Sequence, residues 1–206
     1  MRPLGKDVAD RAGEWYKDAV QGAFNGALAR KESRSGKMKH KQYRIRNAGF
    51  ADTAAIFRLI RQNPEELIPR PVSDILENID RFIVAEADGK VAGAVSWQIL
   101  PDIGLAKNPS VEIKSLAIAL PHRKKGLGKA LVHAAIERIL VLRPAQIIVL
   151  TFHPDFFLKF GFEKVAKRKL MHKLYMGCLN CAKYDSPFTC PEVAMILKIS
   201  AKTGRN

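Results

Sequence analysis

A basic, glycine-containing segment lies between a strand-like stretch and a helix-like stretch and could bind an anion. It consists of Arg123, Lys124, Lys125, Gly126, Leu127, Gly128 and Lys129. Its glycines allow a tight turn whose successive backbone N–H groups point outward, at the positive end of the following helix dipole. Such an anion nest suits a pyrophosphate. The pattern Arg-x-x-Gly-x-Gly differs from a dinucleotide-binding loop and from a nucleoside triphosphatase loop, and alone it also fits a plain strand-to-helix turn.

The three cysteines lie together near the C-terminus, at Cys178, Cys181 and Cys190. Three thiolates could bind zinc with His172 as a fourth ligand. However, Cys-x-x-Cys followed by a single cysteine lacks the second pair of a typical zinc site, so we assign no metal. Reduced thiols in a loop near a substrate pocket are the alternative. An odd number of cysteines also argues against a disulfide framework, which predicts a cytoplasmic protein.

The chain is strongly basic. Its 35 Lys and Arg residues against 20 Asp and Glu give a net charge of +15, which favours an anionic partner. A nucleic-acid-binding module is therefore one hypothesis, but the sequence has no aromatic RNA-binding strand pair and no zinc-finger spacing. No run of about 18 apolar residues predicts a membrane span. The N-terminus also lacks the continuous apolar core of a signal peptide.

The elements that must position these residues alternate along the chain. Residues 7–29 predict an amphipathic helix, followed by a basic linker that ends at residue 42. Strands are predicted at 43–46, 82–87, 91–100, 111–119, 146–152 and 192–199, and Asp88-Gly89 joins the second and third as a hairpin. Helices are predicted from Asp52 or Thr53 past Ile60, and at 73–79, 126–140 and 155–160. The pattern predicts an α/β (α+β) fold with an open mixed sheet.

The order of these features resembles the GNAT superfamily of N-acetyltransferases. The shared features are a strand, the Arg-x-x-Gly-x-Gly loop, an amphipathic helix, a strand and then Phe-Phe-Leu-Lys-Phe-Gly-Phe, within residues 43–199. The resemblance implies a mostly antiparallel sheet flanked by helices, an acetyltransferase domain at 43–206 and a helical extension at 1–42. It also implies acetyl-coenzyme A as co-substrate, with its pyrophosphate in the 123–129 loop. The preceding strand would splay and contact the acetyl-pantetheine arm through the backbone of Leu116, Ala117 and Ile118.

Three segments also resemble the short, stand-alone bacterial N-acetylglutamate synthases. They are Leu67–Pro71, Glu112–Ile118 and Cys178–Met195. This resemblance implies acetylation of the amino group of glutamate, which begins arginine biosynthesis. A protein or peptide amine, a polyamine or an antibiotic is the alternative acceptor. A polyamine would need an acidic pocket, whereas the candidate residues here are basic.

Glu112 is the candidate general base. An amine attacks a thioester carbon only as the free base, so a group must take up its proton, directly or through water. Alternation along a strand places Glu112 on the same face as Leu116 and Ile118, aligned with the bound thioester. The alternative is a surface carboxylate that pairs with Lys114 or an arginine. Backbone N–H groups freed where the strand splays could polarise the thioester carbonyl.

The chain departs from the family pattern at the group that protonates the departing thiolate. Many members carry Tyr four residues before a Gly-Phe pair, but this chain has Phe157 at that position. A thiol with a pKa of about 8.5 leaves tolerably as the thiolate near neutral pH, so a dedicated acid contributes little. Phe157 and its neighbouring phenylalanines are then predicted to form core or to pack around the pantetheine arm. Tyr175 could replace the acid through folding.

Recognition of an acceptor with two carboxylates requires cations. Arg70, in a proline-rich loop, is the first candidate, and Lys114 lies beside the proposed base. Arg61 is an alternative that also fits a solvated helix face. The expected partners are acetyl-coenzyme A and a small amine, with neither a membrane nor a nucleic acid. The N-terminal helix could pack on a second copy of the chain, forming a homodimer, or extend into solvent.

Overall fold

One seven-stranded sheet organises the residues that the computed structural model describes, which are 43–100, 109–178, 181 and 183–199. The strand order is β1-β2-β3-β4-β5-β7-β6, and every neighbouring pair is antiparallel except β4 and β5. The strands are β1 (Arg44–Asn47), β2 (Phe82–Ala87), β3 (Lys90–Leu100), β4 (Ser110–Ile118), β5 (Gln146–Thr151), β6 (Glu163–Lys164) and β7 (Val193–Lys198). The predicted open, mixed and mostly antiparallel sheet is confirmed. The predicted N-terminal helix and basic linker lie outside the described residues.

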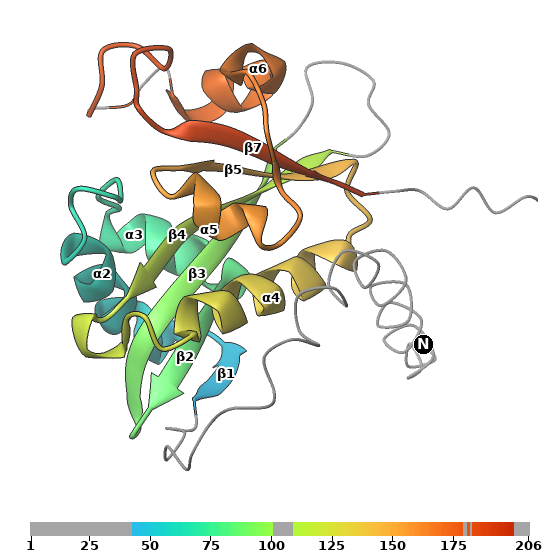
Figure 1. The fold of residues 1–206 in the computed structure, drawn as a ribbon. Helices are drawn as coiled ribbons and strands as arrows, with labels where there is room; N and C mark the ends of the chain where they lie inside the picture. Colours follow the sequence, from blue (N-terminus) through green and yellow to red (C-terminus); the bar gives the residue numbers. More distant parts are fainter. Residues whose placement is uncertain (1–42, 101–108, 179–180, 182, 200–206) are drawn as a thin grey trace, which may run out of the picture.

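Helices cover both faces of this sheet (Figure 1). The α-helices are α2 (Thr53–Arg61), α3 (Val72–Glu77), α4 (Leu127–Leu140), α5 (Pro154–Leu158) and α6 (Met171–Lys173). A π-helical turn, η5 (Leu174–Cys178), continues α6. Short 3₁₀ turns are η1 (Phe50–Asp52), η2 (Ile79–Arg81), η3 (Leu120–His122) and η4 (Lys167–Leu170). The helix predicted at 73–79 is thus divided into α3 and η2, and the helical segment between β6 and β7 is not predicted.

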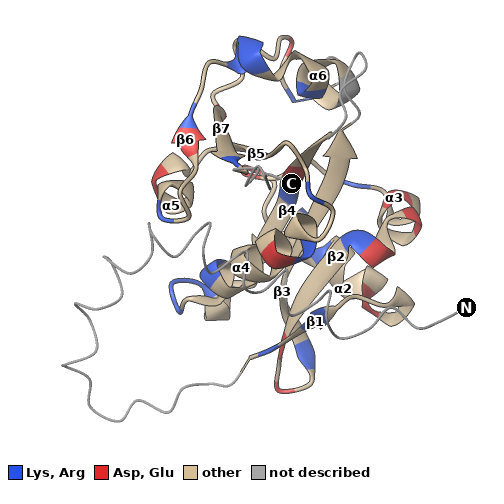
Figure 2. Ribbon diagram, turned by 90° about the vertical axis from the view of Figure 1, so that its right-hand side faces the viewer, with Lys and Arg blue, Asp and Glu red and all other residues tan. Residues whose placement is uncertain are grey.

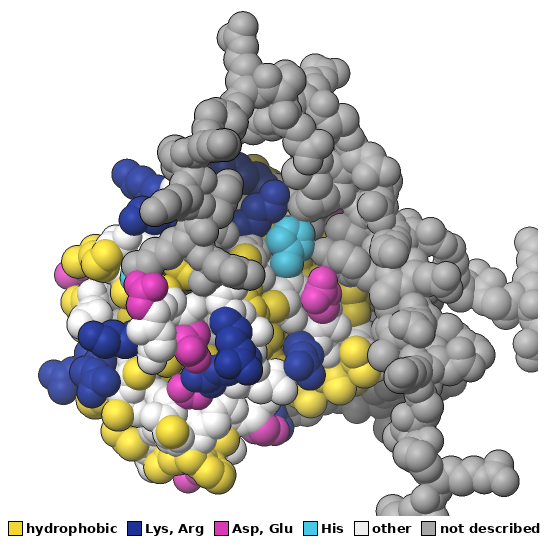
Figure 3. Space-filling model, turned by 90° about the horizontal axis from the view of Figure 1, so that it is seen from below, with side chains coloured by type: hydrophobic (Ala, Val, Ile, Leu, Met, Phe, Trp, Pro, Cys, Tyr) yellow, Lys and Arg dark blue, Asp and Glu magenta, His cyan; other side chains and the backbone are white. Residues whose placement is uncertain are grey.

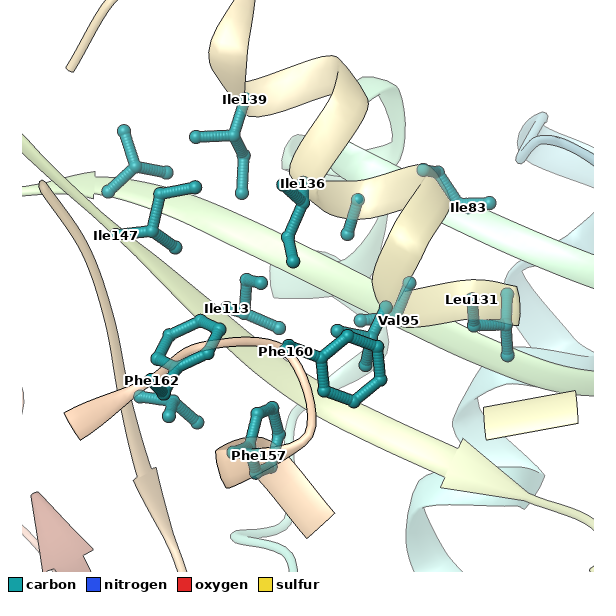
Figure 4. Close-up of a cluster of buried hydrophobic side chains, with 14 of the residues drawn as sticks. Ile83, Val95, Ile113, Leu131, Ile136, Ile139, Ile147, Phe157, Phe160 and Phe162 are labelled. Carbon is teal, nitrogen blue, oxygen red and sulfur yellow. The ribbon is translucent and has the colours of Figure 1, made fainter. Parts of the chain in front are cut away.

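Two apolar cores lie on opposite faces of the central strands. In the larger core, α4 packs Leu131, Ile136 and Ile139 against the sheet, and side chains from the α5 region close the other side (Figure 4). In the second core, the predicted face of α2 with Ile56 and Ile60 packs on strand residues of β2 and β3. Because both faces of these strands are covered, β2 is apolar along almost its whole length.

Local sequence signals position the first strands. Asp88 and Gly89 both have positive φ, 52° and 71°, as a two-residue hairpin turn requires, and this confirms the predicted hairpin. Asp52 occupies the N-cap of α2 but makes no side-chain cap hydrogen bond. Its carboxylate instead accepts two hydrogen bonds from Arg46, at 2.7 and 2.9 Å, and one from the backbone N–H of Gly49 at 2.8 Å. Asp52 therefore fastens β1 to the start of α2.

Candidate active site

A cleft opens where β4 and β5 separate. The two parallel strands pair only at Val111 with Ile147 and Glu112 with Ile148, so their later residues diverge. The space between them forms a cleft of about 710 Å³. Its lining comes from four regions: the separated halves of β4 and β5, the loop before α4, the segment around α5, and the segment after α2 with Asn63, Glu66 and Leu67. The splayed strand that the sequence predicts is therefore present.

The loop before α4 lines one end of this cleft. Gly126 caps the helix with φ of +83°, a backbone conformation that glycine adopts without strain, and Lys124 also has a positive φ of 58°. Gly128 faces the ring of Phe156, and a Cβ built on Gly128 would lie 3.6 Å from that ring. The absence of a side chain at Gly128 keeps the cleft open. In Figure 2 the three consecutive basic residues of this loop, Arg123, Lys124 and Lys125, form a blue segment just before α4.

Not every residue predicted to bind the cofactor lines the cleft. Those that do are Leu116, Ile118, Arg123, Lys124, Gly126, Gly128 and Lys129. Leu127 is buried in the larger core and Ala117 in the second core. The ammonium of Lys125 donates a 2.6 Å hydrogen bond to the carbonyl of Pro121. Leu127 and Ala117 therefore anchor the loop and strand to the two cores, whereas Lys125 is exposed on the loop.

Arg123 links the loop before α4 to β4 and to the segment after α2 by hydrogen bonds. Its Nε donates a 3.2 Å hydrogen bond to the carbonyl of Ile118, and its Nη2 donates to the side-chain oxygen of Asn63. Asn63 is buried at the end of α2 and itself donates a 2.7 Å hydrogen bond to the carbonyl of Leu59. The guanidinium therefore joins β4, the loop and α2 at the rim of the cleft.

A bulge in β4 overturns the predicted arrangement of its side chains. Ala94 pairs with Ala117 and Ser96 with Lys114, so β4 carries one extra residue opposite β3, and Ser115 has φ of 54°. An extra residue reverses which face the following side chains occupy. Glu112 therefore does not share a face with Leu116 and Ile118, which pack against the α4 core. The predicted face of Glu112 is wrong because β4 is not a regular strand.

A second, smaller cavity of about 250 Å³ lies beside β3 and β4. It is lined mainly by polar side chains: Arg70, Asp74, Asn78, Ser96, Gln98, Lys114 and Lys173, with Trp97 and Gly177. Lys114 lines both this cavity and the cleft, so it lies where the two spaces approach each other. We call the smaller space the acceptor cavity. It contains both residues that the sequence proposes for substrate recognition.

Arg70 is held in the acceptor cavity by several contacts. Its Nε donates to the carboxylate of Asp74, and its Nη1 donates to the hydroxyls of Ser96 and Ser115 at 3.3 and 3.2 Å. The guanidinium carbon also lies 5.3 Å from the centre of the Phe82 ring. The hydrogen bond from Arg70 is the main cause of the lowered pKa of Asp74. Arg70 therefore presents a fixed and permanently charged group next to the bulge.

Lys114 is a partly buried cation. Its ammonium donates a 2.9 Å hydrogen bond to the side-chain oxygen of Gln98 on β3. Burial lowers the pKa of Lys114, and the positive charges of Arg70 and Lys173 add to that effect, while Glu112 opposes it. An anion in the acceptor cavity would relieve this unfavourable burial of positive charge.

Glu112 lies behind the acceptor cavity with 4% of its surface exposed. The ammonium of Lys173 lies 2.8 Å from Glu112 Oε2, and the two groups form an ion pair. Burial is the largest single influence and lowers the pKa of Lys173, but Glu112, Cys178 and Glu192 together raise it, and the net shift is upward. The alternative role considered for Glu112, a surface carboxylate paired with Lys114 or an arginine, is wrong, because Glu112 is buried and its cation is Lys173.

Sequence relatives identify the family. Residues 53–162 match the Acetyltransferase (GNAT) family. An uncharacterized N-acetyltransferase of Chlorobaculum tepidum is 32% identical over 154 residues, which are 74% of this chain and 94% of that protein. The chain belongs to the GNAT acetyltransferase family. It is therefore an acetyl-coenzyme A-dependent N-acetyltransferase.

Other proteins are similar to this GNAT chain at lower identity. An amino-acid acetyltransferase of Mycobacterium tuberculosis is 28% identical over 146 residues, covering 68% of this chain and 79% of that protein. Rv2747 from Mycobacterium tuberculosis, solved in complex with CoA, has a TM-score of 0.64 at 22% identity and covers 76% of this chain and 99% of its own. N-acetylglutamate synthase from Neisseria gonorrhoeae, solved with coenzyme A and N-acetyl-glutamate, has a TM-score of 0.62 at 20% identity, covering 79% of this chain and 36% of its own. The two structural similarities establish the fold.

The aromatic residues of the GNAT domain lie as the sequence predicts. Phe157 and Phe160 are buried in the larger core, and Phe156 packs beside them while also lining the cleft.

Tyr175 is 56% exposed and does not line the cleft or the acceptor cavity. Arg61 lies over the ring of Phe57 on α2, at 5.5 Å, and is also outside both spaces.

The cysteine segment shows no arrangement for a metal ion among the described residues. Cys178, Cys181 and Cys190 are free thiols, and no group of three or more His, Cys, Asp or Glu side chains in the described ranges could hold one. Burial raises the pKa values of the Cys178 and Cys190 thiols, so they are less reactive than exposed thiols. Within the same ranges, no helix has both the length and the apolar character needed to cross a membrane.

Sequence reasoning missed several residues of the acceptor cavity. Ser96 and Gln98 lie on β3 directly opposite Lys114 and Glu112, so the register of the β3–β4 pair would have revealed them. Lys173 comes from α6, in a segment whose sequence shows no clear helical period. No sequence signal connects this lysine to Glu112.

Proposed function

We propose that this N-acetyltransferase transfers the acetyl group of acetyl-coenzyme A to the amino group of a small amino acid, with L-glutamate as the first candidate. The observation that carries the proposal is the charge of the acceptor cavity. Arg70, Lys114 and Lys173 face it, while two carboxylates, Asp74 and Glu112, offset two of these three charges. One positive charge remains for an anionic ligand, which favours an acidic acceptor over a polyamine.

The similar proteins support the same class of acceptor. The Mycobacterium tuberculosis relative carries the name amino-acid acetyltransferase, and the Neisseria gonorrhoeae structure contains N-acetyl-glutamate. If glutamate is the acceptor, the chain performs the first step of arginine biosynthesis, a cytoplasmic pathway. The cofactor would lie in the cleft, with its pyrophosphate at the 123–129 loop and its thioester near the β4 bulge.

In the proposed reaction the protein acts mainly by positioning. A carboxylate of the acceptor amino acid binds Arg70 and Lys114. The ammonium group of the same acceptor loses one proton to Glu112. The free amine attacks the thioester carbon, so a C–N bond forms and the C–S bond breaks. The thiolate leaves, and the second proton passes from the new amide nitrogen to solvent or to the thiolate. Backbone N–H groups of β4 that β5 no longer pairs are suited to stabilise the oxyanion.

Glu112 is buried, so proton transfer to it requires a water molecule or a bound amine that reaches its carboxylate. Glu112→Gln is expected to lower kcat/KM by about 10²-fold at neutral pH, as the loss of a general base does. Much of that loss should return at higher pH, where the acceptor amine is already free. Full activity of Glu112→Gln at pH 7 would show that the base lies elsewhere.

Specificity is tested by measuring thiol release from acetyl-coenzyme A with glutamate, glutamine, aspartate, spermidine and a peptide amine. Glutamate is expected to be the preferred acceptor. Arg70→Ala should raise the KM for glutamate by roughly 10- to 100-fold, because a charge-assisted contact is worth about 1.5–3 kcal/mol. Arg61→Ala, an arginine on α2 outside both spaces, is the matched control and should behave like the parent. Equal activity of the parent on glutamate and glutamine would exclude recognition of a side-chain carboxylate.

A further inference from the structure

The ion pair between Glu112 and Lys173 is buried on both sides. The side chain of Lys173 is 11% exposed and that of Glu112 is 5% exposed. A buried carboxylate without a cation takes up a proton, because burial disfavours its charged form. The ammonium of Lys173, 2.8 Å from the carboxylate, is therefore placed to offset the cost of burying a charge on Glu112.

Few other titratable groups act on this pair. Lys114 lies on the same strand as Glu112, Cys178 on η5, and Glu192 just before β7. Burial raises the pKa values of the Cys178 thiol and the Glu192 carboxyl, and the charges of both groups contribute to the raised pKa of Lys173. Lys114 has a lowered pKa and donates its hydrogen bond to Gln98. Lys173 is thus the cation in direct contact with Glu112.

The position of Lys173 also connects the pair to the substrate. Lys173 lines the acceptor cavity, whereas Glu112 lies behind it. Gly177, one turn later, leaves room for the ammonium: a Cβ built on Gly177 would lie 3.2 Å from Lys173 Nζ. The helical segment α6–η5 therefore holds the lysine between the cavity and the carboxylate.

We propose that Lys173 is a positioning residue that keeps Glu112 ionised and oriented at the back of the acceptor cavity. The proposal rests on the proposed role of Glu112 as general base. Its consequence is specific to proton handling. Without the ammonium, the desolvated carboxylate holds its proton to a higher pH, and the enzyme needs a higher pH to work.

The test is the pH dependence of kcat/KM for acetyl transfer to glutamate, in the parent and in four variants. Lys173→Met and Lys173→Gln remove the charge, Lys173→Arg retains it, and Glu112→Gln removes the base. In the two neutral variants, the pH range over which kcat/KM rises should lie about one pH unit or more higher than in the parent. On the acid side of this range kcat/KM should be about tenfold lower than in the parent, and the difference should disappear at high pH. Lys173→Arg should restore the pH dependence toward that of the parent.

Lys198→Met is the matched control, because Lys198 pairs with Glu163 at 3.0 Å in an exposed contact on β6 and β7. It should leave the pH profile unchanged. Urea unfolding and acetyl-coenzyme A binding identify any neutral variant that is misfolded, and the other neutral variant then decides. If kcat/KM of a folded neutral variant has the same pH dependence as the parent while Glu112→Gln is still slow, the role proposed for Lys173 is wrong and that of Glu112 is retained. Parent-like activity of Glu112→Gln overturns the general base, and the role of Lys173 with it.

Discussion

Several charged groups of this N-acetyltransferase share a small and partly buried space. Arg70, Lys114 and Lys173 lie beside Asp74 and Glu112. Burial of ion pairs costs desolvation free energy that their attraction does not always repay, so such pairs are poor devices for stability alone. Their concentration where two cavities approach each other is better explained by function, because perturbed charges gather at catalytic and binding sites.

The coenzyme loop gives the first prediction. Gly128→Val should abolish binding of acetyl-coenzyme A by isothermal calorimetry while the protein stays folded. A Cβ at Gly128 meets Phe156 only at an ordinary contact distance of 3.6 Å, so the backbone tolerates a side chain, but the valine methyl groups extend into the cleft. Gly49→Ala, at a position with no atom near the added Cβ, is the control. Undiminished binding in folded Gly128→Val would remove the phosphate-loop assignment.

Phe157 gives a prediction about the departing thiolate. Phe157→Tyr restores the hydroxyl that many GNAT enzymes carry, but kcat should stay within about twofold of the parent, because a thiol with a pKa of about 8.5 leaves without help. The ring of Phe157 is in edge contact with Phe156 and Phe162, with centroids at 5.1 and 5.6 Å, so the hydroxyl should also cost about 1 kcal/mol of stability. A several-fold rise in kcat would mean that thiolate departure limits turnover.

At the scale of elements, Asp52 gives a prediction about stability and pH. The hydrogen bonds from Arg46 are the main cause of its lowered pKa, so the folded state favours the carboxylate. The stability it contributes is present above the unfolded value of about 3.9 and is lost as pH falls through the lower folded value. Asp52→Asn should cost about 1.5–3 kcal/mol in urea unfolding at pH 7, and that difference should shrink below about pH 4. An unchanged difference at low pH would contradict this account.

The sequence predicts those elements whose signals are local. The Asp88-Gly89 hairpin, the apolar face of α2 and the glycine turn before α4 each depend on residues close together in the chain. The bulge at Ser115 is different, because serine does not mark a positive φ and the register depends on pairing with β3. The same is true of Lys173, whose partner Glu112 comes from a distant strand. The sequence therefore allows the residues of the 123–129 loop and Arg70 to be proposed as site residues. It does not predict on which face of β4 Glu112 lies, or that Lys173 pairs with it.

At the scale of the whole molecule, residues 43–199 contain the two apolar cores described above and a third, smaller apolar cluster between β5, β7 and η4. We therefore expect residues 43–206 to fold and to transfer acetyl groups without residues 1–42. Cooperative urea unfolding and a kcat within about threefold of the full chain would agree with the predicted domain boundary. Loss of cooperative unfolding would show that the first 42 residues belong to the folded unit.

The surface of the described domain carries both signs of charge. On the face shown in Figure 3, Lys and Arg side chains are interspersed with Asp and Glu. Mixed charge of this kind is screened efficiently by salt at distances beyond about 10 Å. The basic loop before α4 and the acceptor cavity are local concentrations within this background.

The separation of β4 from β5 divides the sheet into two panels, β1 to β4 and β5 with β7 and β6, joined at only two residue pairs. A cofactor lying in that seam would supply the missing cross-links between the panels. Amide hydrogens on the open side of β4 should then exchange slowly with deuterium only when the donor is bound. Donor at about 100 times its Kd would add about 2.7 kcal/mol to the free energy of unfolding and would raise Tm. The acetyl donor, when bound, would thus also stabilise the fold by linking the two parts of the sheet.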